Sequence, residues 1–483
     1  MLSVVDNATQ WLPVSHVHFH TKHNESVEVK LRSGFILRTT DDHGMLVCDD
    51  SLTLRQVSPL EVTGKPVPVA RRIPIPVLRR EMDTPDGHTP LSRNFGYVIG
   101  HYLGDGGAYD SDKAVRLMSD HEAHLAAVKV AARECLSAPM NDIVTGGKLK
   151  GFKIASDQWW AWFREHLGVL SHDKRLPAWC MAGPEEFRWG IVDGLLSTDG
   201  HVAVSKRDAT TCCICSDNRD LLDDLSVLLR SLGVMTSIAV TGVTHWRLHM
   251  DLDDVGELSL THPERHDKLR RAVALYADKA RQYTKVMPWN KALRDAWVTA
   301  LPGGFAELRD RYPILSSTYV QKGYVSLLMA RRFVDEVGLP GDVPLLTRWV
   351  SMINDSDLLF VVVDSVDVIA REEVTFDVTV PGPHVTVCPV SGLVTHQTMS
   401  VHVPVGDKTV TDVRERMMAS KMLWSIKDRG KTMGNVKHEQ ILGLGMGKDP
   451  GGDNHRFSSA DDAMAAIERG EVDLNDNVEI GQH

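Results

Sequence analysis

The 483-residue chain lacks any apolar run of about 18 residues, and its start does not look like a secretion signal. These absences argue against a membrane-spanning helix and a cleaved leader, so we expect a soluble protein of the cytoplasm. Cysteine is also scarce, because only seven are scattered along the chain, which favours a reducing compartment. Three of them lie in TTCCICSD at 210–217, without the spacing of paired zinc ligands. We expect this run to be a buried strand.

An overall excess of positive charge is missing too, since the formal net charge is −10. Any contact with nucleic acid would therefore need a local basic patch. Residues 268–285 and 331–333 are candidates for phosphate contacts, with a solvated helix face as the alternative. An apolar content of 43% with 24% charged residues is an ordinary globular balance, and the length allows several domains.

The most informative feature that is present is a change of sequence character at residue 398. Apolar residues alternate before it, a Pro-Gly-Pro turn follows, and a second apolar stretch ends in His-Gln-Thr. This pattern predicts a β-hairpin whose end is fixed in a β core. The apolar positions are Phe376, Val378, Val380, Val385, Val387, Leu393 and Val394.

The end of this hairpin carries a reactive triplet, His396, Gln397 and Thr398. The carboxamide of Gln397 can attack its own backbone carbonyl, and His396 can polarise that carbonyl as a proton donor. Thr398 offers a hydroxyl nucleophile. The triplet has the chemistry needed to cut one peptide bond.

In order and spacing these residues resemble the C-terminal splicing blocks of inteins. The resemblance places Asp377 and His384 in the penultimate block, His396 at the penultimate histidine and Thr398 at the first residue of the downstream host protein. Gln397 stands where the family usually has Asn, so cyclisation would form a six-membered imide. The resemblance implies an all-β Hint splicing domain built from both ends of the intein, here residues 1–85 and 356–397.

Residues 26–47 alternate like strands, turn at Ser33 and Gly34, and end in Thr40-Asp41-Asp42-His43. This stretch resembles the intein TxxH block, which implies that Thr40 and His43 contact the upstream scissile peptide and assist its acyl shift. The opening MLSVVDNATQWLPVSHVHF resembles the segment that follows the first intein block. We therefore expect the first nucleophile to be missing, either because the intein is split or because the gene is fragmented.

Two apolar helical runs, residues 95–106 and 187–200, both end in Asp-Gly. Glycines at helical spacing in both runs would let two helix backbones approach closely and bring Asp105 and Asp199 together. Paired carboxylates beside a DNA backbone suit Mg²⁺, which binds phosphate oxygens and favours phosphodiester hydrolysis. The alternative is a pair of buried helices with C-terminal glycine caps.

The two runs resemble the paired motifs of LAGLIDADG (DOD-type) homing endonucleases, which are nested in many inteins. KRLPAW at 174–179 resembles the family's block before the second motif, and residues 216–234 resemble the helix after it. The resemblance implies an α/β nuclease at 90–265 with two pseudo-symmetric halves. Lys174 would stabilise charge or position a water, with a solvated surface lysine as the alternative. The periodicity of residues 266–350 predicts a helical subdomain that contacts DNA or acts as a spacer.

Residues 398–483 resemble the RNA polymerase β′ subunit directly after its catalytic aspartate loop. Three stretches carry this resemblance in order: 398–418, 438–445 and 457–480. The aspartate loop itself is absent, so no nucleotidyl-transfer residue is assigned. A divergent polymerase gene of this type with an intein favours a phage source, which places the protein in the host cell cytoplasm.

Together these features predict a multidomain protein: an intein-encoded, Mg²⁺-dependent homing endonuclease that makes a double-strand cut, within a split or truncated splicing element. The expected partners are double-stranded DNA, a separately encoded N-terminal fragment and, through the tail, RNA polymerase subunits, with no membrane. One alternative is a splicing element whose nuclease is inactive and whose product is the polymerase subunit. Another is a gene fragment with neither activity.

Overall fold

The structure is a computed structural model that describes residues 1–5, 8–20, 25–205, 210–242, 244–277, 285–369, 375–380 and 384–396, and in the tail 454–459, 466, 469 and 477–480. It divides into two compact units, Met1–Thr398 and Met399–His483. In the second unit, β25 (Asn454–Phe457) pairs in parallel with β26 (Asn477–Ile480). Among the described residues, no helix has the length and apolar character needed to cross a bilayer.

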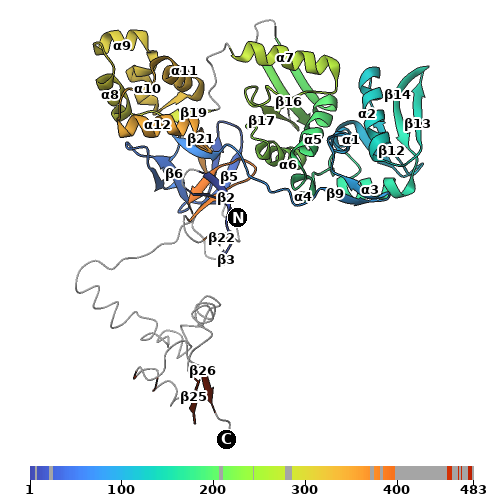
Figure 1. The fold of residues 1–483 in the computed structure, drawn as a ribbon, viewed down its shortest axis with the longest axis horizontal. Helices are drawn as coiled ribbons and strands as arrows, with labels where there is room; N and C mark the ends of the chain where they lie inside the picture. Colours follow the sequence, from blue (N-terminus) through green and yellow to red (C-terminus); the bar gives the residue numbers. More distant parts are fainter. Residues whose placement is uncertain are drawn as a thin grey trace. The chain divides into compact units, whose positions relative to one another are not determined.

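The first unit contains a repeat of helix, two strands, helix, two strands, helix (Figure 1). Its first copy is α1 (Arg93–Asp105), β11 (Gly106–Tyr109), β12 (Ala114–Met118), α2 (Glu122–Cys135), β13 (Met140–Thr145), β14 (Lys148–Ile154) and α3 (Asp157–Leu167). The four strands form an antiparallel sheet in the order β11-β12-β14-β13. Ser92 caps the start of α1, accepting a hydrogen bond from the backbone N–H of Phe95.

The second copy follows the short helix α4 (Ala178–Met181) and repeats the topology. It is α5 (Glu185–Thr198), β15 (Gly200–Val204), β16 (Thr210–Ser216), α6 (Arg219–Ser231), β17 (Thr236–Thr241), β18 (His245–Met250) and α7 (Pro263–Ala277). Its sheet has the matching order β15-β16-β18-β17. The cysteines of TTCCICSD lie on β16, where Cys212 and Cys213 are buried, as the sequence predicted.

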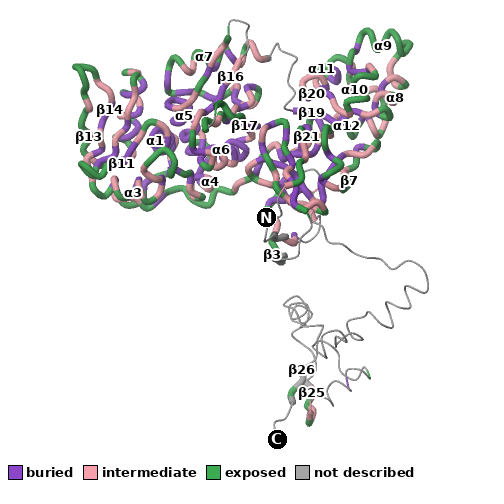
Figure 2. Tube along the Cα trace, turned by 180° about the vertical axis from the view of Figure 1, so that it is seen from behind, coloured by how far each residue is buried: buried purple, intermediate pink, exposed green. Residues whose placement is uncertain are grey.

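Helices α1 and α5 pack directly against each other between the two sheets (Figure 1), and Figure 2 shows the burial along them. A Cβ atom on Gly100 would lie 2.1 Å from the carbonyl oxygen of Ile191, and one on Gly194 would lie 2.4 Å from that of Tyr97. Only glycine allows such backbone approach. The close packing of the two helices is therefore confirmed.

Most of the remaining strands lie at the two ends of the first unit. Near its start are β1 (Leu2–Val5), β2 (Ala8–Trp11), β3 (His16–His20), β4 (Ser26–Leu31), β5 (Ile36–Thr40), β6 (Gly44–Cys48), β7 (Leu54–Val57), the 3₁₀ turn Pro59–Glu61, β8 (Pro66–Ala70), β9 (Glu81–Thr84) and β10 (Gly87–Pro90). After the repeat come β21 (Leu358–Ile369), β22 (Thr375–Thr379), β23 (Val385–Val387) and β24 (Val394–His396). Strands from the two ends pair directly: β21 with β4 and β8, β22 with β3, and β24 with β6.

The predicted hairpin before residue 398 is wrong in its pairing. The first stretch, β22, pairs with β3 rather than with β23, and the hairpin is formed by β23 and β24 instead. The turn that makes this possible lies at 388–393, where Gly392 has a φ of 73°. Alternation identifies strands but does not identify their partners, and here the partner of β22 lies near the start of the chain.

A helical part joins the repeat to β21. It comprises β19 (Val286–Pro288), α8 (Lys291–Ala300), α9 (Phe305–Arg311), the 3₁₀ turn Pro313–Leu315, α10 (Ser317–Lys322), β20 (Tyr324–Ser326), α11 (Leu327–Val337) and α12 (Pro344–Asn354). Buried aromatic rings hold it together, including Trp289 and Trp349 with centroids 5.1 Å apart and Trp297 and Phe333 at 4.8 Å. The segment predicted to be helical begins within α7, which packs on β15 and β16 of the repeat.

Candidate functional sites

The two aspartates predicted from the helical runs lie at adjoining helix ends. Asp105 is the last residue of α1, and Asp199 is the C-cap residue of α5. A Cβ atom on Gly104 would lie 2.0 Å from Oγ1 of Thr198 and 3.4 Å from Oδ2 of Asp199. The helix packing therefore brings both carboxyl groups to one place.

The surroundings of the two carboxyl groups oppose negative charge. Burial raises the pKa of both, and for Asp199 burial and then the charge of Asp105 raise it to about 6. The nearby positive charges of Lys174 and Arg265 act in the opposite direction and favour the ionised form of both acids. Two carboxyl groups at one place can offer several oxygen ligands to a cation.

Lys174 lies close to this pair of acids. Its side chain is almost fully buried, and Nζ donates to the carbonyl oxygens of Tyr102 at 2.8 Å, Leu103 at 3.1 Å, Gly104 at 3.2 Å and Gly106 at 2.9 Å. It thus caps the carbonyl end of α1. Burial lowers the pKa of Lys174 to about 8, against the opposing charges of Asp199 and Asp105. The alternative of a solvated surface lysine is wrong.

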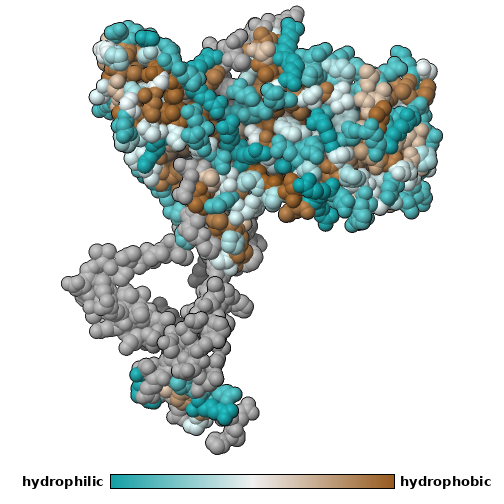
Figure 3. Space-filling model, in the orientation of Figure 1, coloured by the Kyte–Doolittle hydropathy of each residue, from teal (hydrophilic) through white to brown (hydrophobic). Residues whose placement is uncertain are grey.

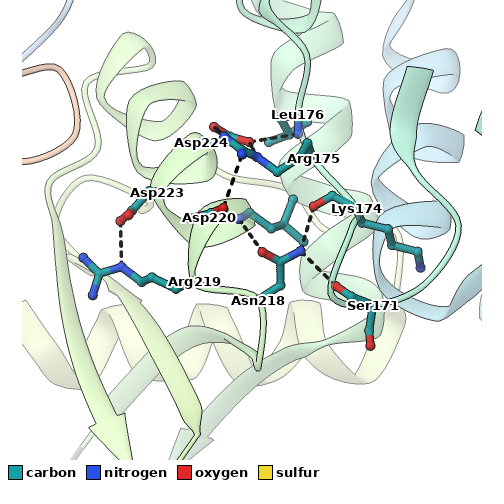
Figure 4. A network of polar contacts seen from close by, with 10 residues as sticks. Ser171, Lys174, Arg175, Leu176, Asn218, Arg219, Asp220, Asp223 and Asp224 are labelled. Carbon is teal, nitrogen blue, oxygen red and sulfur yellow. Dashed lines mark hydrogen bonds and ion pairs between the residues drawn. The ribbon is translucent and has the colours of Figure 1, made fainter. Parts of the chain in front are cut away.

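The loop that carries Lys174 is fixed by α6 (Figure 4). Asn218, the N-cap residue of α6, donates from Nδ2 to the carbonyl oxygens of Ser171 at 2.9 Å and Lys174 at 2.7 Å. Asp224 accepts two bonds from the guanidinium of Arg175, at 2.6 and 2.8 Å. The KRLPAW block and α6 are therefore bonded to each other, and together they hold the backbone at Lys174 in place.

Arg265 on α7 is a site residue that the sequence reasoning missed. Its Nη1 donates to the carbonyl oxygen of Leu196 and its Nη2 to that of Thr198 at 2.8 Å, so it caps α5 as Lys174 caps α1. Burial lowers the pKa of Arg265, and the charges of Asp105 and Asp199 oppose this shift. The one signal in the sequence is that Arg265 follows Asp199 at nearly the distance at which Lys174 follows Asp105.

A groove of about 400 Å³ runs beside the second acid, between β15 and α7. It is lined by residues 200–204 and by the cations Arg265, Lys268 and Arg271. Two of the candidate phosphate contacts thus lie next to the carboxylate pair. Lys285, at the end of the same predicted segment, is instead buried between Asp251 at 3.1 Å and Asp254 at 2.8 Å. On the face shown in Figure 3, hydrophilic residues surround smaller apolar groups.

Three histidines form a buried cluster between α1, α2 and the start of α7. The ring centroids of His101 and His124 lie 5.0 Å apart, as do those of His124 and His262. Burial is the first cause that lowers the pKa of His101 to about 3, of His124 to about 2 and of His262 to about 4. Within the described ranges, no group of three or more His, Cys, Asp or Glu is arranged to hold a metal ion.

Acid should destabilise the protein through this cluster. The native histidines bind fewer protons than the unfolded ones, whose pKa is about 6.5, so their contribution to stability is complete above pH 6.5 and falls as the pH drops toward 4. In that window each histidine lowers the free energy of unfolding by roughly 1.4 kcal/mol for every pH unit of acidification. His101→Leu should flatten the dependence of Tm on pH between 6.5 and 4.5, whereas His245→Gln at an exposed ring should leave it unchanged. An unchanged slope in His101→Leu would contradict this assignment.

The residues matched to intein blocks gather at another place. His396 on β24 pairs with Gly44 of β6, directly after the turn formed by Thr40 and His43, in which the N–H of His43 donates to the carbonyl oxygen of Thr40 at 3.2 Å. The ring of His384 lies 6.4 Å from that of His396, and its φ of 51° is unusual for a residue with a side chain.

Two of the predicted splicing residues lie outside the described residues, and a third can be placed only by its backbone. Asp377 is on β22, where it pairs with His18 of β3. Gln397 and Thr398 follow directly after β24, beyond the described part of the chain. The structure thus brings together Thr40, His43, His384 and His396.

One comparison with known protein families matches part of the second copy of the repeat. The sequence profile of the LAGLIDADG-like domain matches residues 186–250, which run from α5 to β18. Among the curated proteins, none matches the chain. Matches among the solved structures include I-DmoI in complex with DNA and Ca, at 15% identity and a TM-score of 0.27. This match covers 35% of this chain and 87% of that chain.

Two further solved structures match with similar identities and TM-scores. I-WcaI bound to its DNA recognition sequence has 13% identity, covers 37% of this chain and 87% of its own, and has a TM-score of 0.28. The N-terminal LAGLIDADG domain of DUF199/WhiA has 11% identity, with coverages of 41% and 96% and a TM-score of 0.26. The protein is a multidomain chain of mixed α/β content that carries a LAGLIDADG-like domain.

Proposed function

We propose that the repeat at 93–277 is a site-specific DNA endonuclease of the homing type. The observation that carries this proposal is the meeting of Asp105 and Asp199 at the ends of two glycine-packed helices. The LAGLIDADG-like match to residues 186–250 supports it. The substrate would be double-stranded DNA, a copy of the host gene without the insertion.

The residues at the helix ends fit a divalent cation, for which Mg²⁺ is the first candidate. The charge of Asp105 raises the pKa of Asp199, so a cation held between the two carboxylates would relieve this repulsion. Their oxygens are the ligands that Mg²⁺ prefers, and water and DNA phosphate would complete its shell. The bound ion would stabilise charge on the attacking and leaving oxygens. Asp105 and Asp199 would hold it.

The cations around the pair have a separate role in this proposal. Lys174 and Arg265 neutralise the carbonyl ends of α1 and α5, and their charges oppose protonation of the two acids. The groove beside β15, with Lys268 and Arg271, offers a path for the DNA backbone despite the net charge of −10. Cleavage of a plasmid with the uninterrupted host sequence tests the proposal and separates it from an element with an inactive nuclease.

A second function is favoured by the place where β24 meets β6. We propose that residues 1–85 and 356–397 form a Hint-type splicing domain, inserted in a polymerase β′-like subunit whose downstream part is residues 398–483. The register of His396 against Gly44, with His384 nearby, supports this proposal. The proposed partners of this domain are a separately encoded N-terminal fragment and, through the tail, RNA polymerase subunits.

In this domain the tail would be released at residue 398. The carboxamide nitrogen of Gln397 attacks its own backbone carbonyl carbon, and the bond from that carbon to the nitrogen of Thr398 breaks. A proton lost by the carboxamide goes to the leaving amine, so the products are a six-membered imide and a free amino terminus at Thr398. His396 donates a hydrogen bond to the carbonyl oxygen as charge develops on it.

The full chain should therefore release a fragment that begins at Thr398, detected by intact mass after incubation. Gln397→Ala should abolish release because it removes the attacking nitrogen, and His396→Ala should slow it by roughly a hundredfold. Co-expression with an N-terminal fragment should in addition give a ligated product. Release that persists in Gln397→Ala would contradict the proposed chemistry.

A further inference from the structure

The second LAGLIDADG-like repeat makes direct polar contacts with the turn that precedes the last splicing strand. This turn comprises residues 388–393, between β23 and β24. Ser226 of α6 donates from Oγ to the carbonyl oxygen of Val390 at 2.9 Å. Arg230, one helical turn later, donates from Nε to the same oxygen at 3.2 Å.

Arg230 also connects the turn to β8. Its Nη1 donates to the carbonyl oxygen of Ala70 at 3.2 Å, and the N–H of Ala70 donates to the carbonyl oxygen of Gly392 at 2.7 Å. A Cβ atom on Gly392 would lie 2.5 Å from Nη1 of Arg230. The guanidinium therefore fills the space that the glycine leaves, and its side chain is almost fully buried.

The turn has a defined shape that these contacts hold in place. The N–H of Gly392 donates to the carbonyl oxygen of Cys388 at 2.7 Å, and that of Cys388 to Leu393 at 2.9 Å. Leu393 then bridges to Val69, and β24 leads to His396 three residues later. The position of His396 thus depends on a turn whose carbonyl groups are bound by α6.

We propose that Ser226 and Arg230 are positioning residues for the C-terminal splicing strand, so that the nuclease-like repeat is a working part of the apparatus that releases the tail. This inference rests on the proposed splicing function. The carbonyl of Val390, which is half-buried, accepts hydrogen bonds from two side chains, and both belong to α6. Without these two donors the carbonyl would lose its hydrogen bonds within the protein, and the turn would open more often.

The test compares hydrogen exchange and tail release in the full chain carrying Arg230→Met, Arg230→Lys or Ser226→Ala. Arg188→Met is the matched control, because Arg188 is a buried arginine of α5 whose guanidinium donates to Ser231 of α6 rather than to the turn. We expect Arg230→Met to speed amide exchange in residues 384–396 by about tenfold and to slow tail release by a similar factor. Arg230→Lys and Ser226→Ala should show smaller changes, and Arg188→Met should show neither.

Each outcome decides the matter. Unchanged exchange at 384–396 in a folded Arg230→Met protein would overturn the inference. Faster exchange with unchanged release would also overturn it, since the contact would then be merely structural. If the wild type releases no tail, the splicing proposal fails, and the exchange experiment alone decides whether α6 holds the turn. If Arg230→Met does not fold, the same comparison is made with the two milder variants.

Discussion

Asparagine in place of Asp105 or Asp199 should lower the rate of Mg²⁺-dependent DNA cleavage by about a thousandfold or more. Asparagine keeps the size of the side chain but removes a charged oxygen ligand. The charges of Lys174 and Arg265 remain beside the site, and with one carboxylate lost they would repel the cation. The measurement is linearisation of a plasmid with the uninterrupted host sequence. Asp364→Asn, an exposed acid on β21, is the control and should cut at the wild-type rate.

The same site should give a characteristic pH dependence. The pKa of Asp199 is raised to about 6, so its proton must leave before the cation binds, and cleavage should rise as the pH passes through about 6. Higher Mg²⁺ concentrations stabilise the ionised carboxylate and should move the midpoint to lower pH. A midpoint independent of Mg²⁺, or an active Asp199→Asn variant, would show that this carboxylate does not hold the ion.

The acids could be predicted from sequence because their positions follow from local rules. Glycine spacing marks the faces of α1 and α5, and an aspartate at the end of each face must then meet the other. Lys174 could be nominated from its block, but its burial depends on the carbonyl end of α1, which packing brings to it. Arg265 had no local signal, because its role depends on where α7 crosses the end of α5.

The β-rich part shows the same division between local and long-range information. Thr40 ends β5 as the alternation predicted, His43 lies in the turn that follows, and His396 ends β24. The partners of these strands could not be predicted, because several pairings satisfy the same alternation. The predicted pairing of β22 with β23 was therefore wrong, and β22 pairs with β3. The contact of Arg230 with Val390 is equally invisible in sequence, since the two residues belong to different parts of the fold.

Gly100→Ala should be among the most destabilising small substitutions in this chain. The added Cβ atom would lie 2.1 Å from the carbonyl oxygen of Ile191 and 3.0 Å from its Cα, so backbone must move rather than a flexible side chain. Overpacking of this kind costs about 3 kcal/mol, which corresponds to a fall in Tm of roughly 6–12 °C for a domain of this size. Gly304→Ala is the matched control, because a Cβ atom there meets nothing within 4 Å and the residue has a φ of −80°.

The substitution also tests whether helix packing sets the geometry of the acids. Forcing α1 and α5 apart at Gly100 moves Asp105 away from Asp199, so the variant should lose cleavage at temperatures well below its own Tm. Thermal unfolding and plasmid cleavage, measured on the same preparation, separate the two effects. A folded Gly100→Ala protein that cuts at the wild-type rate would mean that the acids do not depend on this contact, because a displacement of about 1 Å at a catalytic group already costs on the order of a hundredfold in rate.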